Sequence, residues 1–468
     1  MYYVPRRHPR VQLTGLWLVS ASIFGVSACG DVQTWLKGGE KPETSAPEVV
    51  TGQELPEDPA FAASLVNSDY LNRSVNLRPW LERGFHGGNQ TIAILDNGFA
   101  GLEASRGKNL PPNLTVFQGP IANSADTIHG TKLAEVIFAM TSGSPDWHRR
   151  SEHPRLKLYN ANGFTNFSAA VDQAIQDRVD IIVYSQVWEF GGNFDGRGFI
   201  NAAVNKATSA GILWINAAGN YAASSWQGPL VANFDSTARL PFEGKFVRLV
   251  VEEPQTSVKV TLSWNDFSDS KDWRTSRDLD LALLDRNGRE IAVGRKIQDG
   301  FDHGRDANYS AHARETLETT LPQGVYLLRV DMRSRNFDQN SRIRLAANGR
   351  GVSFADQATD ASVMIPADNP NVLTVGASDD ELSSFGRTNG GITKPEVLAP
   401  SILEFESGIS FQGSSSAAAV AAATIALYRE ACGPLSREQI VFAINNARLA
   451  QRSVKGMGLW LPAPGMCW

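Results

Sequence analysis

The segment FQGSSSAAAVAAATIALYRE, Phe411–Glu430, joins a glycine and three serines to a long run of alanines. Gly413 permits a tight backbone turn, serine is a common helix cap, and alanine has the highest helix propensity. A helix with such small side chains can pass through a crowded interior. A serine in its first turn would lie beside free backbone N–H groups that stabilise a developing oxyanion. The segment therefore fits either a serine cap on a buried helix or a nucleophile, and residues elsewhere must decide.

Three other segments offer partners for a nucleophilic serine. Asp96 ends the apolar run TIAILD, which is typical of a buried parallel strand over residues 91–95 and places a carboxylate at its C-terminal edge. His129 precedes a segment with the apolar spacing of a helix. Asn220 follows a predicted strand and offers a side-chain amide to an oxyanion. Aspartate, histidine and serine in this chain order form one of the known arrangements of a catalytic triad.

These segments resemble the motifs of the subtilisin-like (S8) serine peptidases. The matching motifs are DNG (96–98), HGT (129–131), AAGN (217–220) and GSSSAAA (413–419). The resemblance implies that Asp96 orients the imidazole of His129, which acts as general base and acid. It also implies that Ser415 is the nucleophile and that Asn220 donates to the oxyanion. No cofactor is expected.

The resemblance covers about residues 85–228 and 360–450 and implies an α/β fold, a parallel sheet with helices on both faces. The catalytic domain is expected in two parts, 63–229 and 352–468. Between them, residues 230–351 show short alternating runs separated by turns, which predict an inserted antiparallel β-sandwich. This jelly-roll-like segment resembles the prepeptidase C-terminal modules of secreted peptidases. Its two ends should emerge close together, and the sandwich should be removable without loss of the triad.

The run DIIVYSQ (180–186) occupies the place of the family's strand that lies along the substrate. Ser185 matches the family pattern, whereas Gln186 and Val187 do not, and the missing glycine can obstruct close backbone approach. The resemblance implies that these three residues bind substrate. The following segment WEFGGNFDGRG (188–198) either lines a changed specificity pocket or forms a mobile surface loop.

The N-terminal residues have the pattern of a processing signal. Three arginines precede an apolar stretch that is short for a membrane span, and VSAC ends it at Cys29. This end resembles a bacterial lipobox, which implies a signal peptide over 1–28 and lipidation of Cys29. An ordinary secretory signal and an uncleaved anchor remain alternatives. All three place the protein outside the cytoplasm, and the lipobox implies a periplasmic or outer-membrane lipoprotein. Residues 29–62 contain few apolar groups and are predicted to form a tether.

The charge of the chain argues against nucleic acid as a partner. The formal net charge is −5, and residues 1–28 hold three arginines and no acidic residue, so their removal changes it to −8. The expected partners are a protein or peptide substrate and, through the lipid alone, a membrane. The oligomeric state stays open.

The remaining cysteines and a group of aspartates each allow two interpretations. If Cys29 carries lipid, Cys432 and Cys467 are left as a pair. They either form a disulfide or remain as two free thiols. The carboxylates of Asp266, Asp278 and Asp280 suit calcium, but they also suit the solvated face of an edge strand, and no metal site is assigned.

Three functions fit these observations. The first is a serine endopeptidase that works through an acyl-enzyme. The second is a catalytically silent binding or scaffolding lipoprotein that keeps the fold, and the third is an esterase on the same nucleophile.

Overall fold

The computed structural model describes most of the chain beyond the predicted tether. The described residues are 64–142, 153–304, 306–356, 361–450 and 458–467. The predicted signal peptide, Cys29 and the tether lie outside them. No helix among the described residues is both long enough and apolar enough to cross a membrane.

Within the described chain, a seven-stranded parallel sheet forms the centre of one domain, in the order β18-β15-β5-β4-β1-β3-β2. The strands are β1 (Thr91–Asp96), β2 (Val116–Phe117), β3 (Arg155–Asn160), β4 (Ile181–Tyr184), β5 (Leu213–Ala217), β15 (Leu373–Ala377) and β18 (Val397–Ala399). Strands β1, β4 and β5 consist entirely of buried residues, as expected for a sheet covered on both faces. The predicted α/β fold class is confirmed.

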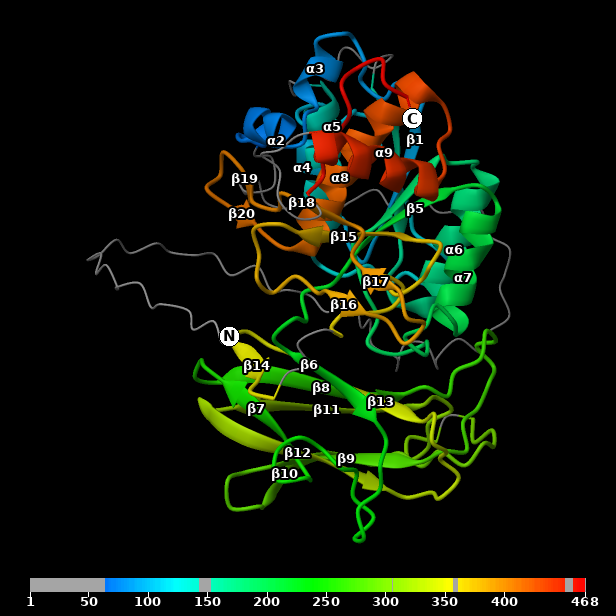
Figure 1. Cartoon of the computed structure of the whole chain (residues 1–468), viewed down its shortest axis with the longest axis vertical. Helices are drawn as coiled ribbons and strands as arrows, with labels where there is room; N and C mark the ends of the chain where they lie inside the picture. Colours follow the sequence, from blue (N-terminus) through cyan, green and yellow to red (C-terminus); the bar gives the residue numbers. More distant parts are fainter. Residues whose placement is uncertain (1–63, 143–152, 305, 357–360, 451–457, 468) are drawn as a thin grey trace, which may run out of the picture.

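Helices cover both faces of this sheet (Figure 1). One face carries α5 (His129–Ser142), α8 (Ser414–Cys432) and α9 (Arg437–Ala450), and the other carries α6 (Gly163–Gln176) and α7 (Phe199–Ser209). The short helices α2 (Ser68–Ser74), α3 (Arg78–Leu81) and α4 (Leu102–Ser105) lie in the N-terminal part. Ile92 and Ile94 of β1 pack with the α5 and α8 cluster, whereas Ala93 and Leu95 pack with the α6 and α7 cluster. This alternation follows because successive strand side chains point to opposite faces.

Helix α8 is the buried helix that the alanine run predicts. Residues 417–423 are completely inaccessible to solvent. Gly413 precedes the helix at φ 127°, where other residues are rarely found, and a Cβ on it would lie 2.9 Å from the side-chain nitrogen of Asn220. The alternative of a serine cap is wrong, because Gly413 occupies the cap position and no side chain caps the helix. The three serines form its first turn instead.

The predicted β-rich segment forms two antiparallel sheets at one end of the molecule (Figure 1). As far as the chain is described, one sheet has the order β10-β9-β12-β7-β14 and the other the order β11-β8-β13-β6. Their strands are β6 (Ser225–Pro229), β7 (Val247–Val251), β8 (Thr256–Trp264), β9 (Leu279–Leu284), β10 (Glu290–Gly294), β11 (Arg314–Leu321), β12 (Gly324–Met332), β13 (Arg342–Asn348) and β14 (Val352–Phe354). Two small hairpins, β16 (Gly386–Arg387) with β17 (Thr393–Lys394) and β19 (Leu403–Glu404) with β20 (Ser410–Phe411), complete the strands.

The sandwich begins earlier and ends later than the predicted range 230–351. Strand β6 pairs with β13, and β14 pairs with β7, so the two sheets span residues 225–354. The short β6 contains Gly and Pro, which are rare in strands, so only its distant partner reveals it. The two ends do lie together, since the Phe354 N–H donates to the Ala223 carbonyl at 2.8 Å.

The sandwich shares a hydrophobic core with the α6 and α7 face of the catalytic domain. One buried cluster contains aromatic residues of both parts: Trp188, Phe190, Phe194 and Phe199 from the catalytic domain, and Trp264 and Phe267 from the sandwich. Asn193 and Phe267 also exchange two hydrogen bonds of 2.9 Å, and the Gly198 N–H donates to Asp269 Oδ1 at 3.0 Å. Both interpretations of segment 188–198 are therefore wrong. It is neither a pocket lining nor a mobile loop, because its aromatic side chains are buried against the sandwich.

Candidate active site

The aspartate and histidine of the predicted triad meet at the C-terminal edge of the parallel sheet. Asp96 is the last residue of β1 and is fully buried, and His129 is the first residue of α5. His129 Nδ1 lies 2.7 Å from Asp96 Oδ2, within hydrogen-bond distance. A Cβ on Gly130 would lie 2.7 Å from the Gly98 carbonyl oxygen and 2.8 Å from Asp96 Cβ. Only glycine after the histidine allows α5 to begin so close to the carboxylate.

The carboxylate of Asp96 changes the basicity of His129. Burial lowers the pKa of His129, but the negative charge of Asp96 and the hydrogen bond between the two residues raise it more. The net effect is a pKa above the ordinary 6.5 of histidine. Asp96 therefore holds the ring and stabilises the imidazolium that a proton transfer would form.

Ser415 lies in the first turn of α8, and its hydroxyl has a partner other than His129. Ser415 Oγ donates to the backbone carbonyl of Ser185 at 2.8 Å. Among the described residues, no hydrogen bond joins Ser415 Oγ to the imidazole of His129. The hydroxyl must give up the Ser185 carbonyl as its acceptor before it can pass its proton to the ring.

The amide of Asn220 is oriented by the residue before the expected nucleophile. Asn220 Oδ1 accepts from the Ser414 N–H at 3.0 Å and from Ser414 Oγ at 3.0 Å. Ser414 Oγ in turn accepts from the Gly219 N–H at 3.0 Å. Because both bonds go to Oδ1, the NH2 group is the end of the amide left to donate to a substrate. This is the arrangement that oxyanion stabilisation needs.

The predicted substrate strand runs directly beside this site. Ser185 supplies the carbonyl that accepts from Ser415, and the Gln186 carbonyl accepts from the side chain of Asn216 at 3.2 Å. A Cβ on Gly219 would lie 3.3 Å from Val187 Cγ2, so the valine side chain packs against the glycine before Asn220. The space between these two segments is thus partly filled.

The sequence matches a known family over most of the domain that carries this site. The model of the subtilase family (peptidase family S8) matches residues 87–243 and 329–458, more than half of the chain. The chain belongs to the subtilase family. It is a subtilisin-like serine peptidase, as predicted, and the break in the match falls within the sandwich.

Individual relatives of this subtilase are distant. Subtilisin DY of Bacillus licheniformis is 26% identical over 203 residues, which are 40% of this chain and 72% of that protein. The CspB protease of Clostridium perfringens is 15% identical, with a TM-score of 0.48 over 85% of this chain and 96% of that one. The epidermin leader peptide processing serine protease of Staphylococcus aureus is 13% identical, with a TM-score of 0.36 over 78% of this chain and 72% of that one.

Two residues beside the site make contacts that the sequence did not predict: Tyr221, which had no expected role, and Glu189, which was expected only as part of the segment 188–198. Tyr221 follows Asn220, is almost fully buried, and donates its hydroxyl to Glu189 Oε1 at 2.9 Å. Glu189 is itself 1% exposed. The sequence does contain a sign of these contacts, because the acidic Glu189 stands between the aromatic Trp188 and Phe190. A carboxylate in such an apolar segment is buried only if hydrogen-bond donors surround it.

The three aspartates considered for calcium make contacts within the subtilase's own chain. Asp280 pairs with Arg333 and Arg295, and Asp266 accepts from the Thr275 hydroxyl. Burial, and then the charge of Asp280, raise the pKa of Asp278 to about 6. Among the described residues, no group of three or more His, Cys, Asp or Glu side chains is placed to hold a metal ion. Calcium was only one of the two interpretations of these aspartates, and no metal site is assigned to them.

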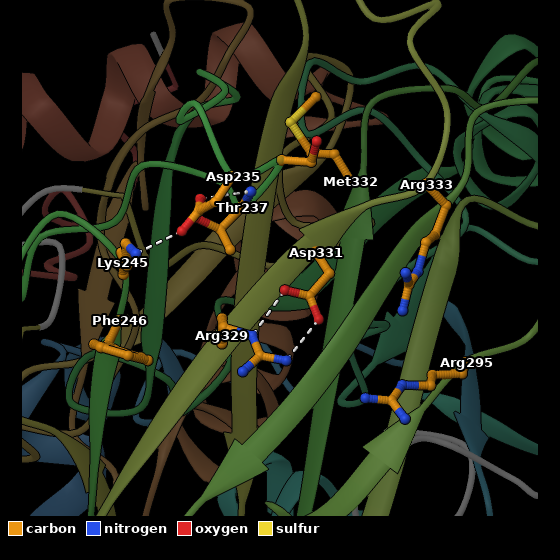
Figure 2. Close-up of a pocket in the computed structure, with 10 residues that line it drawn as sticks. Asp235, Thr237, Lys245, Phe246, Arg295, Arg329, Asp331, Met332 and Arg333 are labelled. Carbon is orange, nitrogen blue, oxygen red and sulfur yellow. Dashed lines mark hydrogen bonds and ion pairs between the residues drawn. The ribbon is translucent and has the colours of Figure 1, made fainter. Parts of the chain in front are cut away.

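A hollow of about 450 Å³ lies on the sandwich, and Arg295 and Arg333 are among the residues that line it (Figure 2). Its lining includes four cations, and each is paired with a carboxylate. The pairs are Lys245 with Asp235, Arg295 with Glu290, Arg329 with Asp331 and Arg333 with Asp280. Because these charges offset one another, the hollow shows no preference for an anion or a cation.

Proposed function

We propose that this subtilase is an endopeptidase that cleaves peptide bonds through an acyl-enzyme on Ser415. The observations that support the proposal are the Asp96–His129 pair at the start of α5, a helix that packs against α8, and the Asn220 amide, which Ser414 in the first turn of α8 orients. A nucleophile, its base and an oxyanion donor are the parts that acyl transfer needs.

The reaction follows from these positions. Ser415 Oγ attacks the peptide carbonyl carbon while its proton passes to Nε2 of His129. The carbonyl oxygen becomes an oxyanion and accepts from the Asn220 NH2 group and the Ser415 N–H. His129 then returns the proton to the leaving amine, and water releases the acid product by the reverse sequence.

The segment Ser185–Val187 has two roles in this proposal: it couples substrate binding to release of the Ser415 hydroxyl, and it limits the size of the substrate residue. A substrate N–H that donates to the Ser185 carbonyl competes with the Ser415 hydroxyl, which is then free to turn toward His129. The Val187 side chain fills space between the substrate strand and Gly219. We therefore expect a preference for a small residue before the scissile bond.

An active-site probe tests the proposal. A fluorophosphonate should label the protein once, as seen by intact-mass analysis, and Ser415→Ala should prevent labelling. Ser416→Ala is the matched control, since Ser416 lies in the same helical turn, and it should still be labelled. A folded protein that is not labelled would favour the silent binding or scaffolding function, to which the Ser415–Ser185 hydrogen bond gives some support. Labelling without cleavage in a peptide library, but with ester hydrolysis, would favour the esterase.

We further propose that Cys29 is lipidated and holds the enzyme in the cell envelope, on the periplasmic side or in the outer membrane. The support comes from the sequence alone: three arginines, the apolar stretch that follows them, and the VSAC motif that ends at Cys29. Cys29→Ser should move the protein from the membrane to the soluble fraction, because the lipid is the proposed anchor. A variant that stays with the membrane would contradict lipid anchoring.

A further inference from the structure

A buried carboxylate joins the sandwich to the loop that carries the oxyanion donor. Glu189 Oε2 accepts from the Thr261 hydroxyl at 2.6 Å, and Glu189 Oε1 accepts from the Tyr221 hydroxyl and from the Asn348 side-chain amide. Asn348 also donates to the Tyr221 hydroxyl at 2.8 Å. Thr261 belongs to β8 and Asn348 to β13, so both of these donors come from the sandwich.

These contacts fix Glu189 in one position. A carboxylate that is almost completely buried is tolerated only when hydrogen bonds replace its water. The backbone of Glu189 is held as well, since the Ser263 hydroxyl donates to its carbonyl at 3.0 Å. The donors of β8 and β13 are therefore needed to keep the Glu189 carboxylate where Tyr221 meets it.

The loop of Asn220 is held on both sides of that residue. Before it, the Gly219 carbonyl accepts from the Ser384 N–H at 2.8 Å. After it, the Tyr221 N–H donates to Ser384 Oγ at 2.9 Å, and the Tyr221 hydroxyl reaches Glu189. The Tyr221 ring also packs in a small buried cluster with Val187 and Met364. A shift of the tyrosine would move the backbone of the adjacent Asn220.

We propose that Glu189 and Tyr221 are positioning residues through which the sandwich aligns the Asn220 amide for oxyanion stabilisation. The inference rests on the proposed role of Asn220. It gives the insert a part in the architecture of the active site, beyond any contact that the sandwich makes with a protein substrate.

The test is a double-mutant cycle with fluorophosphonate as the probe. The maximum labelling rate and the half-saturating probe concentration are measured for the wild type, Tyr221→Phe, Asn220→Ala and the double variant. Asn220→Ala should slow labelling by roughly 10²-fold or more, as loss of an oxyanion donor does. Tyr221→Phe keeps the ring packing and should slow labelling roughly 10-fold at an unchanged half-saturating concentration. It should add nothing in the Asn220→Ala background, because the two residues act through one group.

Two further variants separate positioning from general stability. Thr261→Val removes a sandwich donor to Glu189 with little change in shape, and it should slow labelling and also lose its effect in the Asn220→Ala background. Tyr326→Phe is the matched control, because this tyrosine of β12 is also buried and donates to Pro322 instead. It should label at the wild-type rate.

The outcomes distinguish the inference from the function on which it rests. If Asn220→Ala slows labelling but Tyr221→Phe and Thr261→Val do not, the positioning role is refuted and the proposed function stands. Equal slowing by Tyr221→Phe with and without Asn220 also refutes it, since a general structural defect acts in both backgrounds. If Asn220→Ala itself has no effect, the proposed oxyanion role fails, and the inference fails with it.

Discussion

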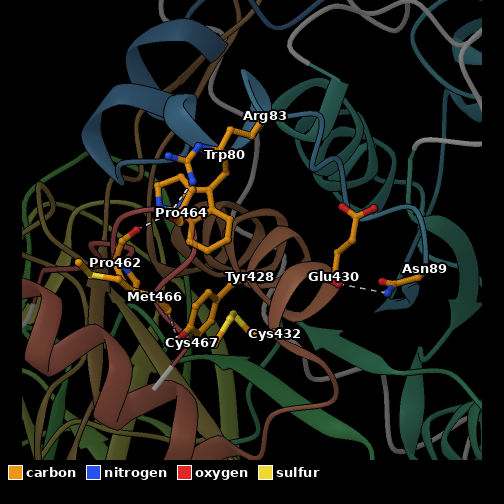
Figure 3. Close-up of a disulfide and its surroundings, with 10 residues drawn as sticks. All are labelled: Trp80, Arg83, Asn89, Tyr428, Glu430, Cys432, Pro462, Pro464, Met466 and Cys467. Carbon is orange, nitrogen blue, oxygen red and sulfur yellow. Dashed lines mark hydrogen bonds between the residues drawn. A yellow bond between two sulfur atoms is a disulfide. The ribbon is translucent and has the colours of Figure 1, made fainter.

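A disulfide between Cys432 and Cys467 fastens the C-terminal tail to the end of α8 that is remote from Ser415 (Figure 3). The tail in turn holds the N-terminal helices. The Trp80 indole N–H donates to the Pro462 carbonyl at 3.0 Å, and Arg83 donates to the Pro464 carbonyl at 2.7 Å. Removal of the bond by Cys432→Ser with Cys467→Ser should therefore lower the free energy of unfolding without touching the catalytic groups.

The size of the effect follows from the length of the closed loop. The two cysteines are 35 residues apart in sequence. In the chain-entropy description, a cross-link over such a loop restricts the unfolded chain by about 4 kcal/mol at 25 °C. At ~2 °C per kcal/mol for a domain of this size, the melting temperature should fall by about 8 °C.

Urea unfolding with and without dithiothreitol measures this effect. The double serine variant should unfold at a lower urea concentration than the oxidised wild type, and the reduced wild type should match the variant. Cys29→Ser is the matched control, because Cys29 has no part in the bond, and it should unfold like the wild type. A loss of less than about 1 kcal/mol, or a reductant effect that persists in the double variant, would refute the reasoning.

Three further predictions concern the site and the insert. Hydrolysis requires neutral His129, so activity should fall as the pH drops through the raised pKa of this residue. Asp96→Asn should lower kcat by roughly 10⁴-fold. It should also move this fall in activity, the acid limb, to lower pH, because burial without the carboxylate lowers the pKa of His129. A limb that does not move in a pH–rate profile would speak against the pair. Val187→Gly should open the space beside Gly219 and extend cleavage in a peptide library to larger residues before the scissile bond, and an unchanged library profile would contradict this. Replacement of residues 224–354 by a Gly/Ser linker should give insoluble protein, because the core that the two domains share would be exposed. A soluble product that still reacts with the probe would show instead that the sandwich can be removed.

The alternation of apolar and polar residues predicted the strands of the sandwich but not how the sandwich packs on the catalytic domain. The alternating runs predicted its central strands, because one face of each is buried and the other is not. They did not predict that the module shares a core with the catalytic domain. Aromatic residues such as Phe190 and Phe194 stand in a glycine-rich segment that is typical of a loop. Their burial depends on strands that come much later in the chain.

The sequence by itself determined the chemical groups, their order and the elements that carry them. Buried parallel strands appear as apolar runs, and α8 appears as an alanine run. Asp96 ends β1 and His129 begins α5, while Asn220 follows β5 and Ser415 lies in the first turn of α8. These are local properties, set by propensity and by the covalent neighbours of each residue.

Only the tertiary structure decided how these groups meet. Ser415 donates to Ser185 across 230 residues of sequence, and Thr261 reaches Glu189 across 72. Such contacts depend on how whole layers pack. This packing places donors around the Glu189 carboxylate and sets whether the Ser415 hydroxyl donates to Ser185 or to His129. A local pattern carries no information about that choice, because each partner is compatible with many others until the fold brings one of them within hydrogen-bond distance.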